Sequence, residues 1–102
     1  MDMNEIMRQA QQMQQRMRQV QDELASRTVT ASAGGGMVSA TLNGKNELLS
    51  IQIDEEVIKP EDRAMLQDLI ISAVNEGIRK SRDMAEAEMR RITGGINIPG
   101  IF

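Results

Sequence analysis

The chain has 102 residues, so we expect a single domain over residues 1–102 with a small core. It contains no cysteine and no histidine, which excludes disulfides, the usual zinc ligands and the commonest general base near neutral pH. The net charge is −3, whereas most DNA-binding domains are basic. Because no signal peptide is recognisable and no run approaches ~20 apolar residues, we expect a cytoplasmic protein that makes no contact with membranes.

The charge is unevenly distributed along the chain. Basic and acidic side chains balance over residues 1–42. Residues 43–78 carry three basic and eight acidic side chains, whereas residues 79–102 carry five basic and three acidic ones. The middle of the chain is therefore acidic and its last part is locally basic.

Residues 3–24 are predicted to form one long helix. Their apolar side chains alternate at spacings of three and four, which is typical of a narrow seam that faces one partner: Met3, Ile6, Ala10, Met13, Met17, Val20 and Leu24. Seven glutamines lie between them and favour a helix without adding charge. The pattern leaves open whether the partner is the chain's own second helix or another copy. The nine methionines specify packing weakly, which favours a second copy that completes the core.

Three runs alternate apolar with polar residues at the period of a strand, over 29–33, 38–42 and 49–53. Gly34 to Met37 and Asn43 to Asn46 are the predicted loops, and they contain the glycines that hairpin turns need. The pattern predicts a three-stranded antiparallel meander with one apolar face. For the first hairpin we expect the pairs Ala33–Val38, Ala31–Ala40 and Val29–Leu42. For the second we expect Leu42–Glu47, Ala40–Leu49 and Val38–Ile51.

A second helix is predicted to begin near Pro60, since proline suits a first helical turn. A broad apolar stripe from Leu66 to Ile78 is suited to covering the sheet. Beyond Arg79 the stripe thins to Met84, Ala87 and Ile92, so this part of the helix should project past the sheet. Thr93-Gly94-Gly95 should end it. The segment from Ile96 to Phe102 is apolar enough that we expect it to pack on the core or in a dimer interface.

The sequence offers no motif for catalysis or for a bound cofactor. Asp54-Glu55-Glu56 lacks the spacing and the glycine of a calcium loop. The Gly34-Gly35-Gly36 run is no phosphate-binding loop, and Gly44-Lys45 is followed by Asn46 where that loop has serine or threonine. We therefore expect no enzyme, no metal, no cofactor and no small-molecule substrate.

Duplex DNA remains a candidate ligand because contacts to phosphates need only exposed arginine and lysine. Single-stranded nucleic acid is disfavoured, since stacking needs aromatic side chains and Phe102 is the only one. On the first helix the candidate arginines lie away from the seam. On the second they lie opposite the apolar stripe or flank it. The candidate DNA-binding residues are Arg8, Arg16, Arg18, Arg79, Lys80, Arg82, Arg90 and Arg91.

The order of the elements and several segments resemble the YbaB/EbfC family of bacterial nucleoid-associated proteins. The resemblance rests on Gly34-Gly35-Gly36-Met37-Val38, on the run from Leu48 to Asp54, on Pro60-Glu61-Asp62 and on Thr93 to Gly100. It implies an α+β fold of the order α-β-β-β-α, and a tight homodimer shaped like tweezers with helical arms. It also implies binding of double-stranded DNA with little sequence preference, a location at the nucleoid and a connection with recombination or repair.

A competing interpretation is a protein-interaction module. In it the acidic centre and the apolar C-terminal segment dock another protein, and contact with DNA is incidental.

Overall fold

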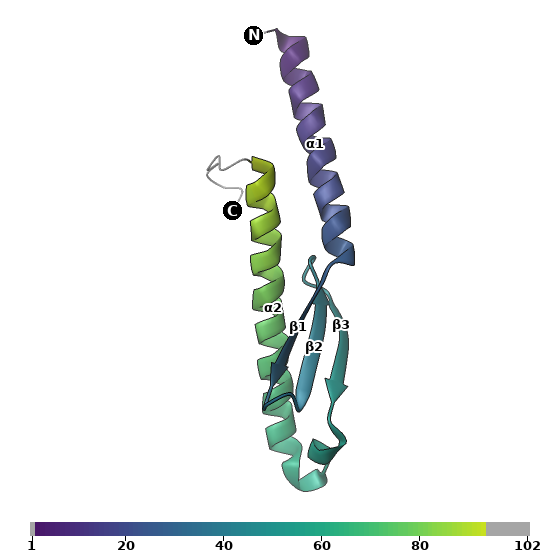
Figure 1. Ribbon diagram of the computed structural model, residues 1–102, viewed down its shortest axis with the longest axis vertical. Coiled ribbons are helices and arrows are strands. Elements are labelled where there is room, and N and C mark those ends of the chain that lie inside the picture. The colour runs from purple at the N-terminus through teal and green to yellow at the C-terminus, as the bar shows by residue number, and fades with distance from the viewer. Residues whose placement is uncertain (1, 94–102) are drawn as a thin grey trace.

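The computed structural model describes residues 2–93, which form two long helices and a small sheet (Figure 1). The elements are α1 (Met3–Ser26), β1 (Thr28–Ala33), β2 (Val38–Asn43), β3 (Leu48–Ile53), the short 3-10 turns Glu55–Val57 and Pro60–Asp62, and α2 (Arg63–Thr93). The predicted α-β-β-β-α order is confirmed. Pro60 opens a 3-10 turn just before α2 rather than the helix itself. The molecule is long and narrow, with extents of 70 × 23 × 16 Å.

The sheet is an antiparallel meander in the order β1-β2-β3. The register predicted for the first hairpin is confirmed, because Ala33 pairs with Val38 and Val29 with Leu42. The loop Gly34 to Met37 is also confirmed, and all three of its glycines adopt positive φ.

The register predicted for the second hairpin is wrong by two residues over most of its length. Ala40 pairs with Ile51 and Val38 with Ile53. Thr41 pairs with Ser50 but Leu42 pairs with Leu48, so Leu49 is an extra residue in β3, as in a β-bulge. Since β2 continues to Asn43, the turn is formed by residues 44–47.

α2 covers only part of the sheet. It packs against β1 and β2, and the fully buried core consists of Val38, Ala40 and Leu42 of β2 with Ala73 of α2. None of the methionines in the described chain belongs to this core, and Met3, Met7, Met13, Met37 and Met65 are exposed. The core of the described chain is therefore built from aliphatic residues and not from methionines.

β3 is an edge strand whose apolar side chains remain uncovered by the described chain. Leu48, Leu49 and Ile51 are 46%, 54% and 38% exposed. Leu48 and Ile51 pair with Leu42 and Ala40, so they belong to the apolar face of the sheet, but α2 crosses that face over β1 and β2. An apolar strip therefore borders the free edge of the sheet.

Close contact between α2 and β2 depends on a row of small residues. Ala73, Gly77 and Ser81 follow one another at intervals of four, and all three are buried. A Cβ at Gly77 would overlap Cδ1 of Leu42, which is 1% exposed. The small side chains therefore set how closely the helix approaches the sheet.

The turn after β2 joins the sheet to both helices. The backbone N–H of Gly44 donates to the carbonyls of Leu24 (2.8 Å) and Arg27 (3.0 Å), at the end of α1. The hydroxyl of Ser81 on α2 donates to the carbonyl of Asn43 at 2.7 Å. A Cβ at Gly44 would stand 2.7 Å from the carbonyl oxygen of Leu24, so only glycine fits this contact.

Beyond the sheet, α2 runs beside the C-terminal part of α1, and the N-terminal part of α1 extends farther than α2 (Figure 1). Of the α1 seam, only Val20 and Leu24 are buried. Ala87 of α2, predicted to continue the apolar stripe, is exposed, whereas Ala85 and Glu88 are partly buried. The expected packing of Ile96 to Phe102 lies outside the described residues. No described helix is both long and apolar enough to cross a membrane.

Gly77→Ala tests the close approach of α2. At an exposed helical site this change would stabilise the protein by about 1 kcal/mol through helix propensity. Here we expect a net loss, since overpacking costs about 1–3 kcal/mol and the buried Leu42 side chain would have to shift. Urea denaturation measures the difference, with Ser72→Ala on the exposed face of α2 as the control. A more stable Gly77→Ala protein would contradict the packing argument.

Candidate nucleic-acid interface

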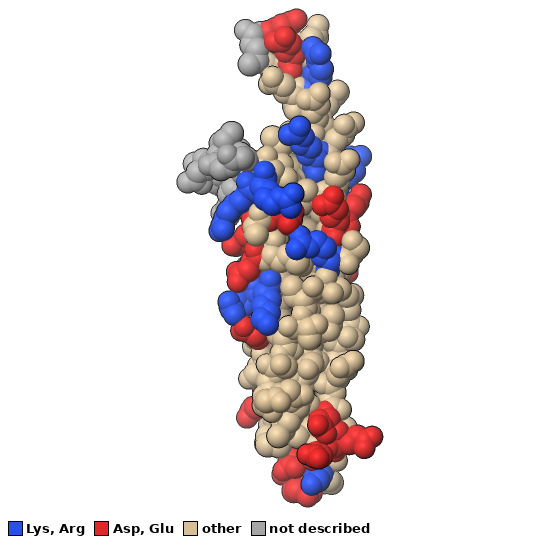
Figure 2. Space-filling view, viewed as in Figure 1, with Lys and Arg blue, Asp and Glu red and all other residues tan. Residues whose placement is uncertain are grey.

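In Figure 2 the basic side chains lie mainly toward one end of the molecule, where acidic side chains are interspersed with them, and a separate group of acidic side chains lies at the other end. At the acidic end, residues 54–68 carry six carboxylates, which belong to Asp54, Glu55, Glu56, Glu61, Asp62 and Asp68. Only Lys59 and Arg63 oppose them there. We call this region the acidic tip. In the described part of the chain, no three carboxylates are arranged to hold a metal ion.

Four of the candidate residues on α2 are already engaged with neighbouring groups. Arg79 pairs with Glu76 and, at 3.4 Å, with Asp83, and Arg90 lies 3.7 Å from Glu86. The ammonium group of Lys80 donates to the carbonyl of Thr30 at 3.2 Å. Arg91 pairs with Glu88 at 3.0 Å.

The ion pair between Arg79 and Glu76 also shifts the pKa values of both side chains. The hydrogen bond from Arg79 to Glu76 lowers the pKa of the glutamate and raises that of the arginine. Because the ion pairs of Arg79 and Arg90 are largely exposed, they are easily screened by salt. They reduce the local positive charge without removing the arginines from solvent.

The remaining candidates lack such partners among the described residues. Within residues 2–93, no carboxylate lies within 4.0 Å of the guanidinium groups of Arg8, Arg16, Arg18 or Arg82. All four residues are exposed. Three belong to α1 and Arg82 to α2, in the part of the molecule where the helices extend beyond the sheet.

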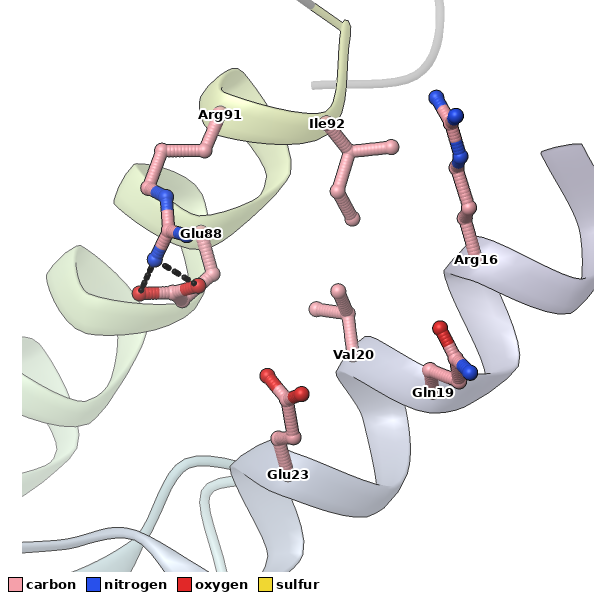
Figure 3. A pocket seen from close by; sticks show the side chains of 7 residues that line it. All are labelled: Arg16, Gln19, Val20, Glu23, Glu88, Arg91 and Ile92. Carbon is pink, nitrogen blue, oxygen red and sulfur yellow. Dashed lines mark hydrogen bonds and ion pairs between the residues drawn. The ribbon is translucent and has the colours of Figure 1, made fainter.

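The location of Arg16 differs from the one predicted from the sequence. Arg16 was predicted on the side of α1 away from the seam, but it lines a hollow of about 200 Å³ between the helices. The residues that line this hollow are Arg16, Gln19, Val20, Glu23, Glu88, Arg91 and Ile92 (Figure 3). Arg16 lies only about a quarter turn from the centre of the seam at ~100° per residue, so its side chain reaches the seam's edge.

Glu88 connects the two helices through an ion pair that the sequence did not reveal. Nη1 of Arg27, the residue that follows α1, donates to Oε1 of Glu88 at 2.6 Å. The Glu88 side chain is 12% exposed and also accepts from Arg91. The hydrogen bond from Arg27, aided by the charges of Arg91 and Arg27, lowers the pKa of Glu88. No local pattern could have identified this pair, because its members are 61 residues apart in sequence.

The family model for the YbaB/EbfC DNA-binding family matches residues 1–96. A protein of Syntrophobacter fumaroxidans named a nucleoid-associated protein is 55% identical over 95 residues, which cover 93% of this chain and 86% of that protein. One with the same name from Pelotomaculum thermopropionicum is 50% identical, over 99% of this chain and 96% of its own.

A solved structure has the same fold. The crystal structure of an uncharacterised protein from Helicobacter pylori matches with a TM-score of 0.83 at 28% identity. The alignment covers 92% of this chain and 99% of the other. This match supports the predicted arrangement of a three-stranded meander between two helices.

The lowered pKa of Glu88 predicts an acid-sensitive link between the helices. A carboxylate stabilised in the folded state contributes stability above its ordinary pKa of 4.5 and loses that contribution as the pH falls through its lower folded value. Glu88→Gln should therefore lower the melting temperature at pH 6, and its difference from the parent should shrink below pH 4.5. Thermal unfolding followed by circular dichroism measures both. Glu86→Gln is the control, since Glu86 is more exposed and lies 3.7 Å from its partner. An equal effect at both positions would show that the Arg27 link contributes nothing specific.

Proposed function

Because the chain belongs to the YbaB/EbfC DNA-binding family, we propose that it is a nucleoid-associated protein that binds double-stranded DNA as a homodimer. The observation that carries this proposal is the family match across residues 1–96, together with relatives named nucleoid-associated proteins at about half identity. The family name describes DNA binding, and we propose no catalytic activity. The nucleoid, within the cytoplasm, is the corresponding location.

The proposed DNA-binding surface lies where the helices extend beyond the sheet. Arg8, Arg16, Arg18 and Arg82 supply its main charge, because they lack carboxylate partners among the described residues. Arg79, Lys80, Arg90 and Arg91 contribute where phosphates compete with their present partners. Phosphate contacts carry no sequence information by themselves, so little sequence preference is expected.

A net charge of −3 is unusual for a DNA-binding protein, but the positive and negative charges of this chain are partly separated along the molecule. Most of the acidic excess belongs to the acidic tip, at the far end from the arginines of α1 (Figure 2). Interactions between exposed charges are screened beyond about 10 Å at 0.1 M salt. DNA at the helical end therefore interacts mainly with the charges located there, and the carboxylates of the acidic tip are largely screened.

The homodimer is proposed to form through β3. An edge strand with exposed apolar side chains invites pairing with another chain. Leu48, Leu49 and Ile51 form such a strip, and a second copy would bury it. The dimer would also present two sets of helical arms to one duplex.

A second candidate function has one observation in its favour. At the acidic tip, Ile58, Lys59, Pro60, Arg63 and Leu66 line a shallow apolar hollow of about 270 Å³. An apolar hollow beside several carboxylates suits a basic, partly apolar protein segment. This hollow would serve the acidic part of the interaction-module interpretation; the apolar C-terminal segment, its other part, lies outside the described residues.

The arginines that lack carboxylate partners among the described residues can be tested by mutation. The double variant Arg18→Ala, Arg82→Ala removes one such residue from each helix. It should weaken binding to all duplex sequences alike, and each lost phosphate contact should flatten the slope of log K against log salt by about 0.9. Fluorescence anisotropy with labelled duplexes over a salt series measures the affinity and the slope.

The matched control removes the same charge from the acidic tip. Lys59→Ala with Arg63→Ala should leave the affinity and the slope close to those of the parent protein. Equal losses in the two double variants would mean that net charge, and not the helical surface, determines binding. A parent protein that fails to bind duplex near 50 mM salt would instead favour the interaction module.

The proposed dimer can be tested at β3. Ile51→Glu places a charge on the apolar side of β3 and should convert a dimer into a monomer in sedimentation velocity at micromolar concentration. Gln52→Glu adds a carboxylate to the next residue, which faces the other side of the strand, and should leave the dimer intact. A parent chain that sediments as a folded monomer would refute the homodimer, whatever the variants do.

A further inference from the structure

The N-terminal half of α1 carries an apolar surface that no described residue covers. We call it the exposed seam, and it comprises Met3, Ile6, Ala10 and Met13, with Met7 at its border. Its large side chains are between 40% and 74% exposed. Of the whole α1 seam, the only buried residues are Val20 and Leu24, near the turn after β2. The exposed seam therefore lacks a partner, although its spacing is that of a packed helix face.

α2, which the C-terminal tail of residues 94–102 follows in sequence, ends beside α1 near the exposed seam. Ile92 lines the same hollow as Val20 and Arg16 of α1 (Figure 3). The nine residues of the tail can extend about 30 Å, since an extended chain advances about 3.3 Å per residue. From Arg16 to Met3, α1 rises only about 20 Å, at 1.5 Å per residue. The tail is therefore long enough to follow the whole exposed seam.

The composition of the tail matches the exposed seam. It has no charged side chain, and four of its nine residues are large and apolar: Ile96, Ile98, Ile101 and Phe102. Methionine adapts its shape to neighbours, and its sulfur packs favourably against an aromatic ring such as that of Phe102. Gln9 and Gln14 flank the exposed seam, and their amides can both donate to and accept from the backbone of an extended segment.

A second α1 helix fits the exposed seam less well. Helices that pair along a narrow seam are selected by opposite charges at the flanking positions. The flanking positions here hold Met7, Gln9, Gln14 and Arg16, which provide no such pairs. If the tail packs on the exposed seam, the apolar side chains of both are buried within one chain.

We propose that residues 96–102 pack along the exposed seam of their own chain and cover it. The tail then returns from the end of α2 across the N-terminal half of α1, and it holds the two helical arms together beyond the hollow. This packing requires neither DNA nor a second copy, so it can be tested on the pure 102-residue chain whether or not the proposed function is correct.

The test uses the absence of cysteine from the chain. In the double variant Met13→Cys, Ile98→Cys, mild oxidation with diamide should join the two thiols within one chain, with loss of two hydrogen atoms to the oxidant. Non-reducing electrophoresis and intact mass should show a cross-linked monomer as the main product. Met13 is exposed, so its replacement should leave the fold unchanged.

The control places the first cysteine on the opposite side of α1 at nearly the same height. Gln15 lies about half a turn from the seam, and the variant Gln15→Cys, Ile98→Cys should give at most a minor cross-linked product. Equal yields in the two double variants would overturn the proposal. So would a covalent dimer as the main product of the Met13 variant, because a second copy would then occupy the exposed seam.

A second measurement avoids cysteine altogether. Phe102 is the only aromatic residue, so any ring-current shift of a methionine methyl group within one chain must come from it. In protein labelled with carbon-13 at the methionine methyls, resonances of the exposed seam should be displaced upfield, and Phe102→Leu should abolish the displacement. Identical methyl spectra for the parent and Phe102→Leu proteins would contradict packing of the tail on the seam.

Discussion

The relation between the two long helices depends on the turn that follows β2. Gly44 approaches the end of α1 so closely that a side chain would collide with the carbonyl of Leu24, and its N–H donates to that carbonyl. On the other side of the turn, Asn43 accepts a hydrogen bond from Ser81 of α2, and both residues are buried. Because buried polar groups need partners, neither helix can shift without leaving one of these groups unsatisfied. The turn therefore fixes where α1 and α2 leave the sheet.

Farther along the helices, ion pairs of Glu88 contribute more than close packing to the contact between α2 and the end of α1. Past Ser81 the apolar contact between α1 and α2 is thin, and Glu88 bonds to both Arg27 and Arg91. This arrangement engages Arg91, while Arg16 on the facing helix lacks a carboxylate partner among the described residues. The same carboxylate thus supports the relative position of the helices and limits how much charge this part of the surface offers.

Much of the fold could be predicted from the sequence because it depends on local patterns. Alternation marked the three strands, and the four-residue Gly34 to Met37 loop fixed the first hairpin. The second hairpin was misjudged because the alternation of apolar and polar residues shows neither where the turn ends nor that Leu49 is an extra residue in β3. The Arg27–Glu88 pair was missed because its two residues lie 61 positions apart in the sequence. For the candidate site, periodicity identified exposed arginines on both helices. It could not tell which of them already have carboxylate partners, since that depends on individual side chains.

The two uncovered apolar surfaces differ in what can cover them. β3 offers unpaired backbone groups along a free edge next to Leu48 and Ile51, so a strand or sheet of another copy satisfies its hydrogen bonds and its apolar side chains together. Past the first turn, the exposed seam of α1 has no unpaired backbone groups, since the helix satisfies its own. Only its apolar side chains remain to be covered. An extended segment can cover them if polar side chains form hydrogen bonds with the backbone of that segment. A second copy at β3 and the chain's own tail on α1 would therefore cover both surfaces without competing, and the arginines of the arms would stay open to solvent.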